Sequence, residues 1–272
     1  MMQTNKVAVV TGGSSGIGRE TASALRALGC TVYELSRRNR ENVGVLHIPC
    51  DVSDEAQVSA AVATVFQAEG RIDIFINNAG FGISGAAEFT RNEDAKRLLD
   101  VNLFGTVNGC KAVIPYMRRQ GFGRIVNISS VAALIPLPFQ AWYSVSKAAV
   151  SSYTAALQNE VRGFGISLCA VMPGDIQSGF TAMREKSEEG REVYGDRIRR
   201  NVARMEKDEM SGMSPAAAGH YIAHIAMKRR IKPEYAIGAE YRLVAVLARL
   251  LPCRLKSRII ARLYAAGQNA SE

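Results

Sequence analysis

The chain has 272 residues, 47% of them hydrophobic, and a formal net charge of +9 at pH 7. This length and apolar content predict one large core, so we expect a single α/β domain over residues 1–272 rather than two domains. The sequence lacks a signal-peptide pattern and an uncharged apolar stretch long enough to cross a bilayer, so we expect a cytoplasmic protein without a membrane span.

The sequence also argues against disulfide bonds, a metal site and nucleic-acid binding. The five cysteines are scattered without paired spacing, which predicts reduced thiols, no disulfide framework and no metal site. His220 and His224 are one helical turn apart, but no third ligand is close in sequence, so a plain helix face is expected. No recognisable nucleic-acid module with basic and aromatic residues is present, and we expect no nucleic-acid partner.

Apolar runs alternate with helical stretches along most of the chain. This alternation predicts a parallel, doubly wound sheet of about seven strands, with helices on both faces and right-handed crossovers. The last of the seven strands is expected to be short. The expected strands are Val7–Val10, Val32–Leu35, Val45–Ile48, Ile72–Ile76, Ile125–Ile128, Ile166–Val171 and Tyr235–Gly238.

A glycine-rich turn, residues 11–18, follows the first strand, and a helical pattern from Thr21 to Leu28 comes next. Glycines let a backbone approach a pyrophosphate closely, and a helix N-terminus offers free N–H groups to phosphates. The order strand, turn, helix therefore favours dinucleotide binding over a purely structural turn. The cofactor contacts expected here are Thr11, Gly12, Ser14, Ser15, Gly16, Ile17 and Gly18.

Tyr143 and Lys147 are four residues apart, so in a helix they share one face. A free tyrosine has a pKa of about 10, and a nearby cation stabilises the phenolate and lowers that value. We therefore expect a phenol that transfers protons near neutral pH. A surface pair on a helix has the same spacing, so this interpretation depends on the other motifs.

Together with further motifs, the glycine turn and the Tyr–Lys pair resemble the short-chain dehydrogenase/reductase family between Lys6 and Phe180. These motifs are Asp51-Val52, Asn77-Asn78-Ala79-Gly80, Val101–Gly105, Ser129-Ser130 and Pro173-Gly174-Asp175-Ile176. The resemblance implies a Rossmann-type fold and an oxidoreductase that uses a nicotinamide cofactor. By resemblance, further cofactor contacts are Asp51, Val52, Asn78, Ala79, Gly80, Tyr143, Lys147, Pro173, Gly174 and Ile176.

The end of the second strand predicts which nicotinamide cofactor is used. An acidic residue there would accept hydrogen bonds from the ribose 2′-hydroxyl of NAD and repel a 2′-phosphate. This chain has Ser36 at the family's acidic position, followed by Arg37 and Arg38. Guanidinium groups match phosphate in charge and geometry, so all three residues are assigned to the cofactor and NADP(H) is predicted rather than NAD(H). The plainer alternative is two solvated charges at a strand end.

The resemblance also implies four catalytic residues and their roles. Tyr143 donates the proton that the carbonyl oxygen receives as hydride reaches the carbon. Lys147 lowers the pKa of Tyr143 and holds the nicotinamide ribose. Ser130 hydrogen-bonds the substrate oxygen, on which charge develops. Asn102, inside Val101–Gly105, holds a water that links Lys147 to solvent.

Residues 178–213 are predicted to form a lid over the substrate. This charged segment contains Met183, Met205, Met210 and Met213, and methionine adapts to irregular apolar shapes, which favours a lipophilic substrate. Alternatively, the methionines fill gaps in the core of two ordinary helices. The apolar stretch 136–139 resembles the corresponding loop of hydroxysteroid and retinol dehydrogenases, which also favours a lipophilic ketone or alcohol.

Residues 240–266 are predicted to form a basic, amphipathic tail of two short helices divided by Pro252. Between Lys228 and Arg262 there are ten basic and two acidic residues. Such a tail can lie on an anionic membrane surface as a peripheral contact, close a substrate pocket or pack on another subunit. Packing is favoured over membrane contact.

These features predict an NADP(H)-dependent oxidoreductase that transfers hydride between nicotinamide C4 and a carbonyl or secondary alcohol. A steroid-like, retinoid-like or long-chain ketone is the favoured substrate. One alternative is a 3-oxoacyl-thioester reductase, whose basic tail would attract an acidic carrier protein or coenzyme A. Another is a non-catalytic NADP(H)-sensing module, although such proteins typically lose the active Tyr or Lys. By resemblance, a homodimer or homotetramer is expected.

Overall fold

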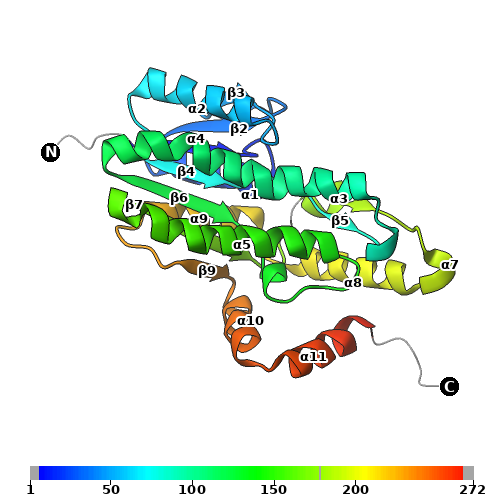
Figure 1. Cartoon of the computed structure of the whole chain (residues 1–272). Coiled ribbons are helices and arrows are strands. Elements are labelled where there is room, and N and C mark those ends of the chain that lie inside the picture. The colour runs from blue at the N-terminus through cyan, green and yellow to red at the C-terminus, as the bar shows by residue number, and fades with distance from the viewer. Residues whose placement is uncertain (1–5, 178, 266–272) are drawn as a thin grey trace.

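A seven-stranded parallel sheet lies at the centre of the structure (Figure 1), a computed structural model that describes residues 6–177 and 179–265. The strands are Val7–Thr11 (β1), Thr31–Ser36 (β2), Leu46–Pro49 (β3), Ile74–Asn77 (β4), Gly123–Ile128 (β6), Ile166–Pro173 (β7) and Glu234–Ile237 (β9). Their spatial order is β3-β2-β1-β4-β6-β7-β9, and every neighbouring pair is parallel.

The predicted doubly wound sheet is confirmed, and the seven strands match the predicted ones apart from their ends. The fourth strand begins at Ile74 rather than Ile72, because the backbone N–H of Ile72 donates to the Gln120 side chain and not to a neighbouring strand. The chain runs outward from β1 in one direction and from β4 in the other. Such a switch opens a crevice at the carboxyl ends of the strands, where ligands bind in open α/β sheets.

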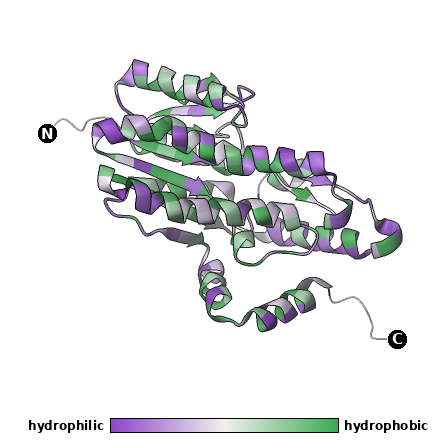
Figure 2. Ribbon diagram, in the orientation of Figure 1, coloured by the Kyte–Doolittle hydropathy of each residue, from purple (hydrophilic) through white to green (hydrophobic). Residues whose placement is uncertain are grey.

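Helices cover both faces of the sheet, α1 and α9 on one and α2, α4 and α5 on the other (Figure 1). They span, in that order, Gly16–Ala27, Pro215–Met227, Glu55–Glu69, Gly105–Gln120 and Ala141–Val161. Along β1, Val7 and Val9 join the core under α2 and α4, whereas Ala8 and Val10 join the core under α1 and α9. Both faces are buried, so these strands are largely apolar runs, and Figure 2 shows hydrophobic segments in the sheet beneath helices that carry both hydrophobic and hydrophilic residues.

Shorter elements build up the carboxyl end of the sheet. Helix α3 (Asn92–Leu99) continues through a π-helical turn at Asp100–Phe104 into α4. Strand β5 (Ile83–Ser84) pairs with β8 (Glu185–Lys186) in a two-stranded sheet that the sequence analysis did not predict. Single 3₁₀ turns lie at Ala87–Phe89, Val131–Ala133 and Arg162–Phe164.

The predicted lid and tail are both helical. The lid segment contains α6 (Phe180–Met183), α7 (Arg191–Tyr194) and α8 (Arg197–Ser211), and the tail contains α10 (Ala239–Leu250) and α11 (Cys253–Ala265). The helical C-terminal extension is confirmed, and Pro252 separates its two helices as predicted. Ser178 of the lid segment and Ala266 of the tail lie outside the described residues. No helix in the described part of the chain is both long and apolar enough to cross a bilayer.

Helices α1 and α9 approach closely because residue 219 has no side chain. A Cβ atom on Gly219 would lie 2.6 Å from the carbonyl carbon of Glu20 and 2.7 Å from the backbone nitrogen of Thr21. Both atoms belong to the backbone of α1, so neither can move aside without shifting that helix. This contact fixes α1, and with it the glycine turn at its N-terminus.

We expect Gly219→Ala to lower the free energy of unfolding by about 2 kcal/mol, because overpacking outweighs the higher helix propensity of alanine. Urea unfolding followed by circular dichroism measures the change. Gly163→Ala is the matched control, since a Cβ atom there meets no atom within 4 Å. Equal stability of the two variants would contradict the close helix contact.

Candidate active site

A cavity of about 990 Å³ lies at the carboxyl ends of the central strands. The glycine turn, the ends of β2, β4, β6 and β7, helix α5, the lid segment and the tail all contribute to its wall. Most of the predicted site residues line it. They are Gly12, Ser14, Ser15, Gly16, Ile17, Ser36, Arg37, Arg38, Asp51, Val52, Asn78, Ala79, Gly80, Ser130, Tyr143, Lys147, Pro173, Gly174 and Ile176.

Three predicted residues, Thr11, Gly18 and Asn102, stand behind this wall rather than in it. The Thr11 hydroxyl accepts a hydrogen bond from the backbone N–H of Asn78 at 2.9 Å. A Cβ atom on Gly18 would lie 2.3 Å from the carbonyl oxygen of Gly12 and from the Asn78 amide nitrogen. Thr11 and Gly18 therefore join the glycine turn to the end of β4, and their direct contact with the cofactor stays a prediction.

The glycine turn leaves room that a side chain would fill. Gly12 has a φ of +66°, and a Cβ atom on it would lie 2.9 Å from the Cα atom of Ala79. Helix α1 begins at Gly16, and its N-cap residue Ser15 makes no side-chain capping bond. The first N–H groups of α1 are therefore available to an anion at the helix N-terminus. This cradle fits the pyrophosphate of a dinucleotide.

The end of β2 presents arginine rather than carboxylate to the cavity. Glu34, the acidic residue of this strand, is 2% exposed and hydrogen-bonds to His47 and Ser36 in the interior. Ser36, Arg37 and Arg38 line the cavity instead. The Arg37 side chain is 76% exposed, and its guanidinium lies 4.0 Å from the Asp51 carboxylate, too loose a contact to neutralise it strongly.

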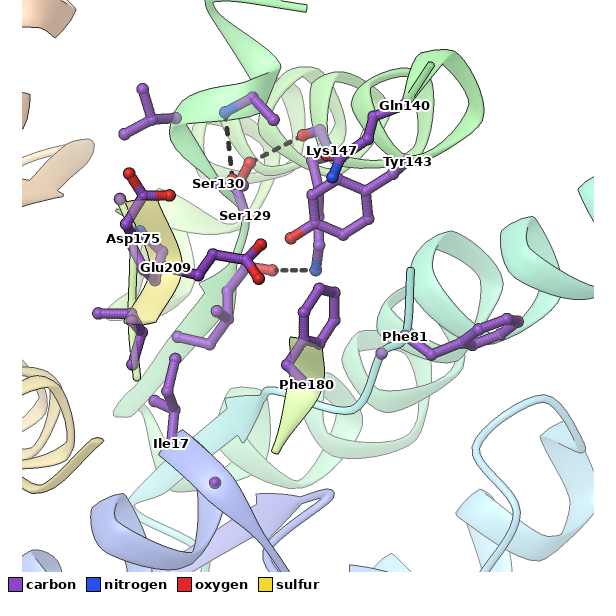
Figure 3. Close-up of a pocket in the computed structure, with 18 of the residues that line it drawn as sticks. Ile17, Phe81, Ser129, Ser130, Gln140, Tyr143, Lys147, Asp175, Phe180 and Glu209 are labelled. Carbon is purple, nitrogen blue, oxygen red and sulfur yellow. Dashed lines mark hydrogen bonds between the residues drawn. The ribbon is translucent and has the colours of Figure 1, made fainter. Parts of the chain in front are cut away.

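Tyr143 and Lys147 project from α5 into the cavity (Figure 3). The Lys147 ammonium donates to the carbonyl oxygen of Ile128 at 2.9 Å and lies 5.8 Å from the centre of the Tyr143 ring. Burial lowers the pKa of Lys147 to about 8. Burial also raises the pKa of Tyr143 to about 12, opposed by a hydrogen bond with Ser130 and by the charge of Arg184.

The lowering of the Tyr143 pKa that the spacing predicted is therefore wrong for this geometry, because burial outweighs the charges around the phenol. Tyr143 is therefore even further from ionising at neutral pH than a free tyrosine. A protonated phenol can donate a proton to a substrate oxygen, and Lys147 beside it can stabilise the phenolate that remains.

Ser129 and Ser130 follow β6 directly and have different partners. Ser129 is buried, and its hydroxyl donates to the carbonyl oxygen of Lys147 at 2.8 Å, which joins the end of β6 to α5. The Ser130 hydroxyl accepts from the backbone N–H of Ala132 at 3.1 Å and hydrogen-bonds Tyr143. Ser130 and Tyr143 lie together at the centre of Figure 3, so one substrate oxygen can contact both hydroxyls.

Asn102 is fully buried in the π-helical turn between α3 and α4. Its amide nitrogen donates to the carbonyl oxygen of Phe81 at 2.9 Å and to the Ser146 hydroxyl at 3.0 Å, and its oxygen accepts from the N–H of Phe81 at 3.0 Å. A Cβ atom on Gly80 would lie 2.9 Å from this oxygen and 3.5 Å from the Lys147 nitrogen. Asn102 therefore fixes the segment after β4 beside Lys147, and both its N–H groups are occupied. The water-holding role stays a prediction.

The lid segment supplies cavity residues that the sequence analysis missed. The Phe180 ring centre lies 5.5 Å from that of Tyr143 (Figure 3). Glu209, from α8, also lines the cavity, and it pairs with the buried Arg184 and accepts a hydrogen bond from Thr181. These partners lie 25 or more residues apart in sequence, so no local pattern indicates them.

The four methionines of the lid segment divide between the two predicted alternatives. Met183 and Met205 line the cavity. Met213 packs against the core between α1, α9 and the sheet, and Met210 is 71% exposed. Only half of them are therefore placed to contact a substrate.

The first turn of α10 closes one side of the cavity. The Tyr241 hydroxyl donates to the Asp175 carboxylate, and a Cβ atom on Gly174 would lie 2.2 Å from the Tyr241 ring. Burial raises the pKa of Asp175, while the Tyr241 hydrogen bond lowers it. The tail therefore packs on the segment that follows β7, one of the arrangements considered from the sequence. Within residues 6–177 and 179–265, no three His, Cys, Asp or Glu side chains are grouped to hold a metal ion.

Comparison with known proteins agrees with this geometry. Residues 6–191 match the family model described as short chain dehydrogenase. A 3-ketodihydrosphingosine reductase of Bacteroides thetaiotaomicron is 41% identical over 227 residues, which are 82% of this chain and 84% of that protein. A short-chain dehydrogenase from Streptomyces avermitilis superposes with a TM-score of 0.82 at 27% identity, over 98% of this chain and all of the other. A 3-ketoacyl-(acyl-carrier-protein) reductase from Brucella melitensis, complexed with NADH, superposes with a TM-score of 0.72 at 26% identity. The match covers 85% of this chain and 96% of the other.

The buried Lys147 is expected to reduce stability at neutral pH. Its pKa is about 8 in the folded protein and 10.5 ordinarily, so the cost of burying its charge is full below pH 8 and disappears as the pH rises to 10.5. Lys147→Met should therefore raise the free energy of unfolding at pH 7 by about 2 kcal/mol, which is about 3 from the pKa difference less about 1 for the lost hydrogen bond.

Urea unfolding at several pH values between 7 and 10.5 measures this gain, which should shrink as the pH rises. Lys207→Met, at an exposed lysine of α8, is the control and should show no such trend. If the Lys147→Met variant is less stable than wild type at pH 7, burial of the Lys147 ammonium does not lower the free energy of unfolding, and the prediction is wrong.

Proposed function

The chain belongs to the short-chain dehydrogenase family of oxidoreductases, and we propose that it reduces a lipophilic ketone with NADPH. The apolar wall of the cavity beyond Tyr143 carries this proposal. It is built by the loop before α5, the lid segment and the inner faces of α10 and α11. Its apolar side chains are Ile135, Leu137, Phe180, Met183, Met205, Val244, Leu247, Leu251, Ile259, Ile260 and Leu263. Apolar walls of this extent suit a long hydrocarbon more than a small polar carbonyl compound.

The relative from Bacteroides supports the same substrate class. Its name gives a ketodihydrosphingosine, a keto lipid, as that protein's substrate. The match extends over 82% of this chain, beyond the cofactor-binding half. We infer that this chain also acts on a long-chain ketone.

The preference for NADP(H) is inferred from the end of β2. Arg37 and Arg38 line the cavity beside Ser36, and Glu34, the acidic residue of this strand, is buried and does not line the cavity. Guanidinium groups bind a phosphate through charge and paired N–H donors. The exposed Arg37 side chain can reach such a group without breaking a strong ion pair.

In the proposed reaction, the bound nicotinamide dinucleotide supplies hydride to the carbonyl carbon of the substrate. Ser130 and Tyr143 hydrogen-bond the carbonyl oxygen, and Tyr143 gives up its proton to that oxygen as the new C–H bond forms. The Lys147 ammonium, held by the carbonyl oxygen of Ile128, stabilises the resulting phenolate. Asn102 fixes the Gly80–Phe81 backbone beside these groups. The expected homodimer or homotetramer stays a prediction.

Two alternative functions can be distinguished from a ketone reductase by experiment. A 3-oxoacyl-thioester reductase is supported by the similarity to the Brucella protein, which is a 3-ketoacyl-(acyl-carrier-protein) reductase. A non-catalytic NADP(H) sensor would bind the cofactor without turnover, but the retention of Ser130, Tyr143 and Lys147 in one cavity argues against it.

We expect Arg37→Ala to weaken NADPH binding about 10- to 100-fold, the equivalent of a hydrogen bond to a charged group worth about 1.5–3 kcal/mol. NADH binding should change by less than about threefold, since no 2′-phosphate is lost. Titration of cofactor fluorescence measures both. Arg162→Ala, at an exposed arginine away from the cavity, is the control. An equal loss for both cofactors would show that Arg37 does not select the phosphate.

Turnover of a homologous series of alkanones with NADPH tests the reaction and the substrate class together. Each added methylene should raise kcat/KM by up to about fourfold while it is buried, since a buried methylene contributes about 0.8 kcal/mol. Tyr143→Phe should lose about 100-fold or more in kcat and still bind NADPH. A higher kcat/KM for 3-oxoacyl thioesters would favour the first alternative, and binding without any turnover would favour the sensor.

A further inference from the structure

The tail exposes an unusual number of large apolar side chains. Among the described residues, seven of the seventeen exposed large hydrophobic side chains lie on α10 and α11. We call them the apolar tail face: Leu243, Val246, Leu247, Leu250, Leu255, Ile259 and Leu263. Their exposed fractions range from 40% for Ile259 to 75% for Leu250. A patch of this kind on a protein surface marks an interaction site.

The spacing of these residues gives each helix one continuous apolar stripe. On α10 each residue has another of the set three or four positions away, with Val246 and Leu247 adjacent in sequence, and on α11 the residues are four positions apart. The opposite sides of the helices are anchored to the protein. Tyr241 packs on Gly174, and Tyr264 lies under the Arg204 guanidinium and against the cluster formed by Ile198, Val202 and Met205. Leu243, Val246, Leu250 and Leu255 do not line the cavity and face away from it, whereas Leu247, Ile259 and Leu263 lie at its rim, where they are both exposed and part of the cavity wall.

Basic residues accompany the stripes. From residue 239 to residue 265 there are six basic side chains and one acidic side chain, Glu240. Arg249 pairs with Glu234. Within the described chain, no ion pair joins Arg242, Arg254, Arg258 or Arg262 to a carboxylate. The tail therefore offers unneutralised positive charge next to exposed leucine and isoleucine, the combination that amphipathic helices use on anionic membrane surfaces.

The apolar tail face is continuous with the mouth of the catalytic cavity. Leu247, Ile259 and Leu263 belong to both, since each lines the cavity and is more than 36% exposed. A hydrocarbon chain moving along the tail face into the cavity would thus stay in contact with apolar side chains. Figure 1 shows α10 and α11 as an arm beside the main body, so the outer sides of both helices are accessible to a flat surface.

We propose that the apolar tail face and its arginines bind the surface of an anionic lipid bilayer, with the cavity mouth facing the lipid. The helices lie in the interface and do not span it, since they have 12 and 13 residues. The partner is a bilayer rather than a second copy of the chain, because a second tail would bring like charges together. Delivery of a ketone from the membrane into the cavity rests on the proposed function, whereas docking itself does not.

The test is co-sedimentation of the full chain with vesicles of phosphatidylcholine alone or mixed with phosphatidylglycerol. Binding should be at least about tenfold tighter to the anionic vesicles and should weaken with salt. The triple variant Leu243→Ser, Leu250→Ser, Leu255→Ser should lose at least about tenfold in affinity for anionic vesicles. The serine side chains that replace the three leucines are too polar to insert into the lipid. None of the three residues lines the cavity. An Arg254→Gln, Arg258→Gln, Arg262→Gln variant should lose the preference for anionic lipid.

The matched control replaces three exposed apolar residues elsewhere, Leu28→Ser, Val43→Ser and Val193→Ser, and should bind vesicles like wild type. Unchanged thermal unfolding midpoints show that the variants fold. Equal binding of the leucine variant and wild type would overturn the proposal. So would a concentration-dependent dimer that the leucine variant abolishes in the absence of vesicle binding, which would make the face an interface between copies.

The delivery step is tested separately. With the ketone embedded in anionic vesicles, the leucine variant should turn over about tenfold more slowly than wild type, whereas both should reduce a water-soluble ketone equally well. Vesicle binding without reduction of any ketone would leave the docking intact and reject the proposed function. Ketone reduction without vesicle binding would support the proposed function and reject the docking.

Discussion

The burial of the Lys147 ammonium is the constraint on which the site depends. The Lys147 ammonium donates a hydrogen bond to the carbonyl oxygen of Ile128 at the end of β6, and burial lowers its pKa to about 8. The surrounding structure must hold that charge where a phenolate will form. The carbonyl of Lys147 itself accepts from Ser129, and Gly80 leaves the space between Asn102 and the ammonium. Several hydrogen bonds around α5 therefore hold this cation in place, although its burial costs stability.

The sequence indicated the fold well, because its signals were local. Continuous apolar runs marked strands buried on both faces, the glycine-rich turn marked the approach to the first helix, and Pro252 marked the division between the two tail helices. The catalytic set came from spacing and resemblance, and the structure places Ser130, Tyr143 and Lys147 in one cavity. Long-range features were not predictable. The β5–β8 sheet, the Arg184–Glu209 pair and the Tyr241–Asp175 hydrogen bond each join segments far apart in the chain. The Tyr143 pKa was predicted in the wrong direction, because spacing shows a neighbouring charge but not the depth of burial.

The C-terminal tail contributes both to the cavity wall and to the exposed surface of the protein. Its inner sides close the cavity through Tyr241 and Tyr264, and its outer sides expose apolar stripes with arginines. From the sequence, packing and membrane contact were competing interpretations of one amphipathic pattern. In the structure, one face of these helices packs on the protein, and the other face is exposed and free for the proposed membrane contact. If the proposed substrate and docking are correct, this combination would let the protein take a ketone from the bilayer while its cofactor stays in water.

The most direct test of the reductase assignment is hydride transfer to a long-chain 3-keto lipid, followed with NADPH carrying deuterium at C4. We predict that the alcohol product contains one deuterium on the carbinol carbon from only one of the two C4-deuterated epimers, and that deuterated NADH transfers far less. Absence of deuterium from the product with both NADPH epimers, or more efficient transfer from NADH, would contradict the account.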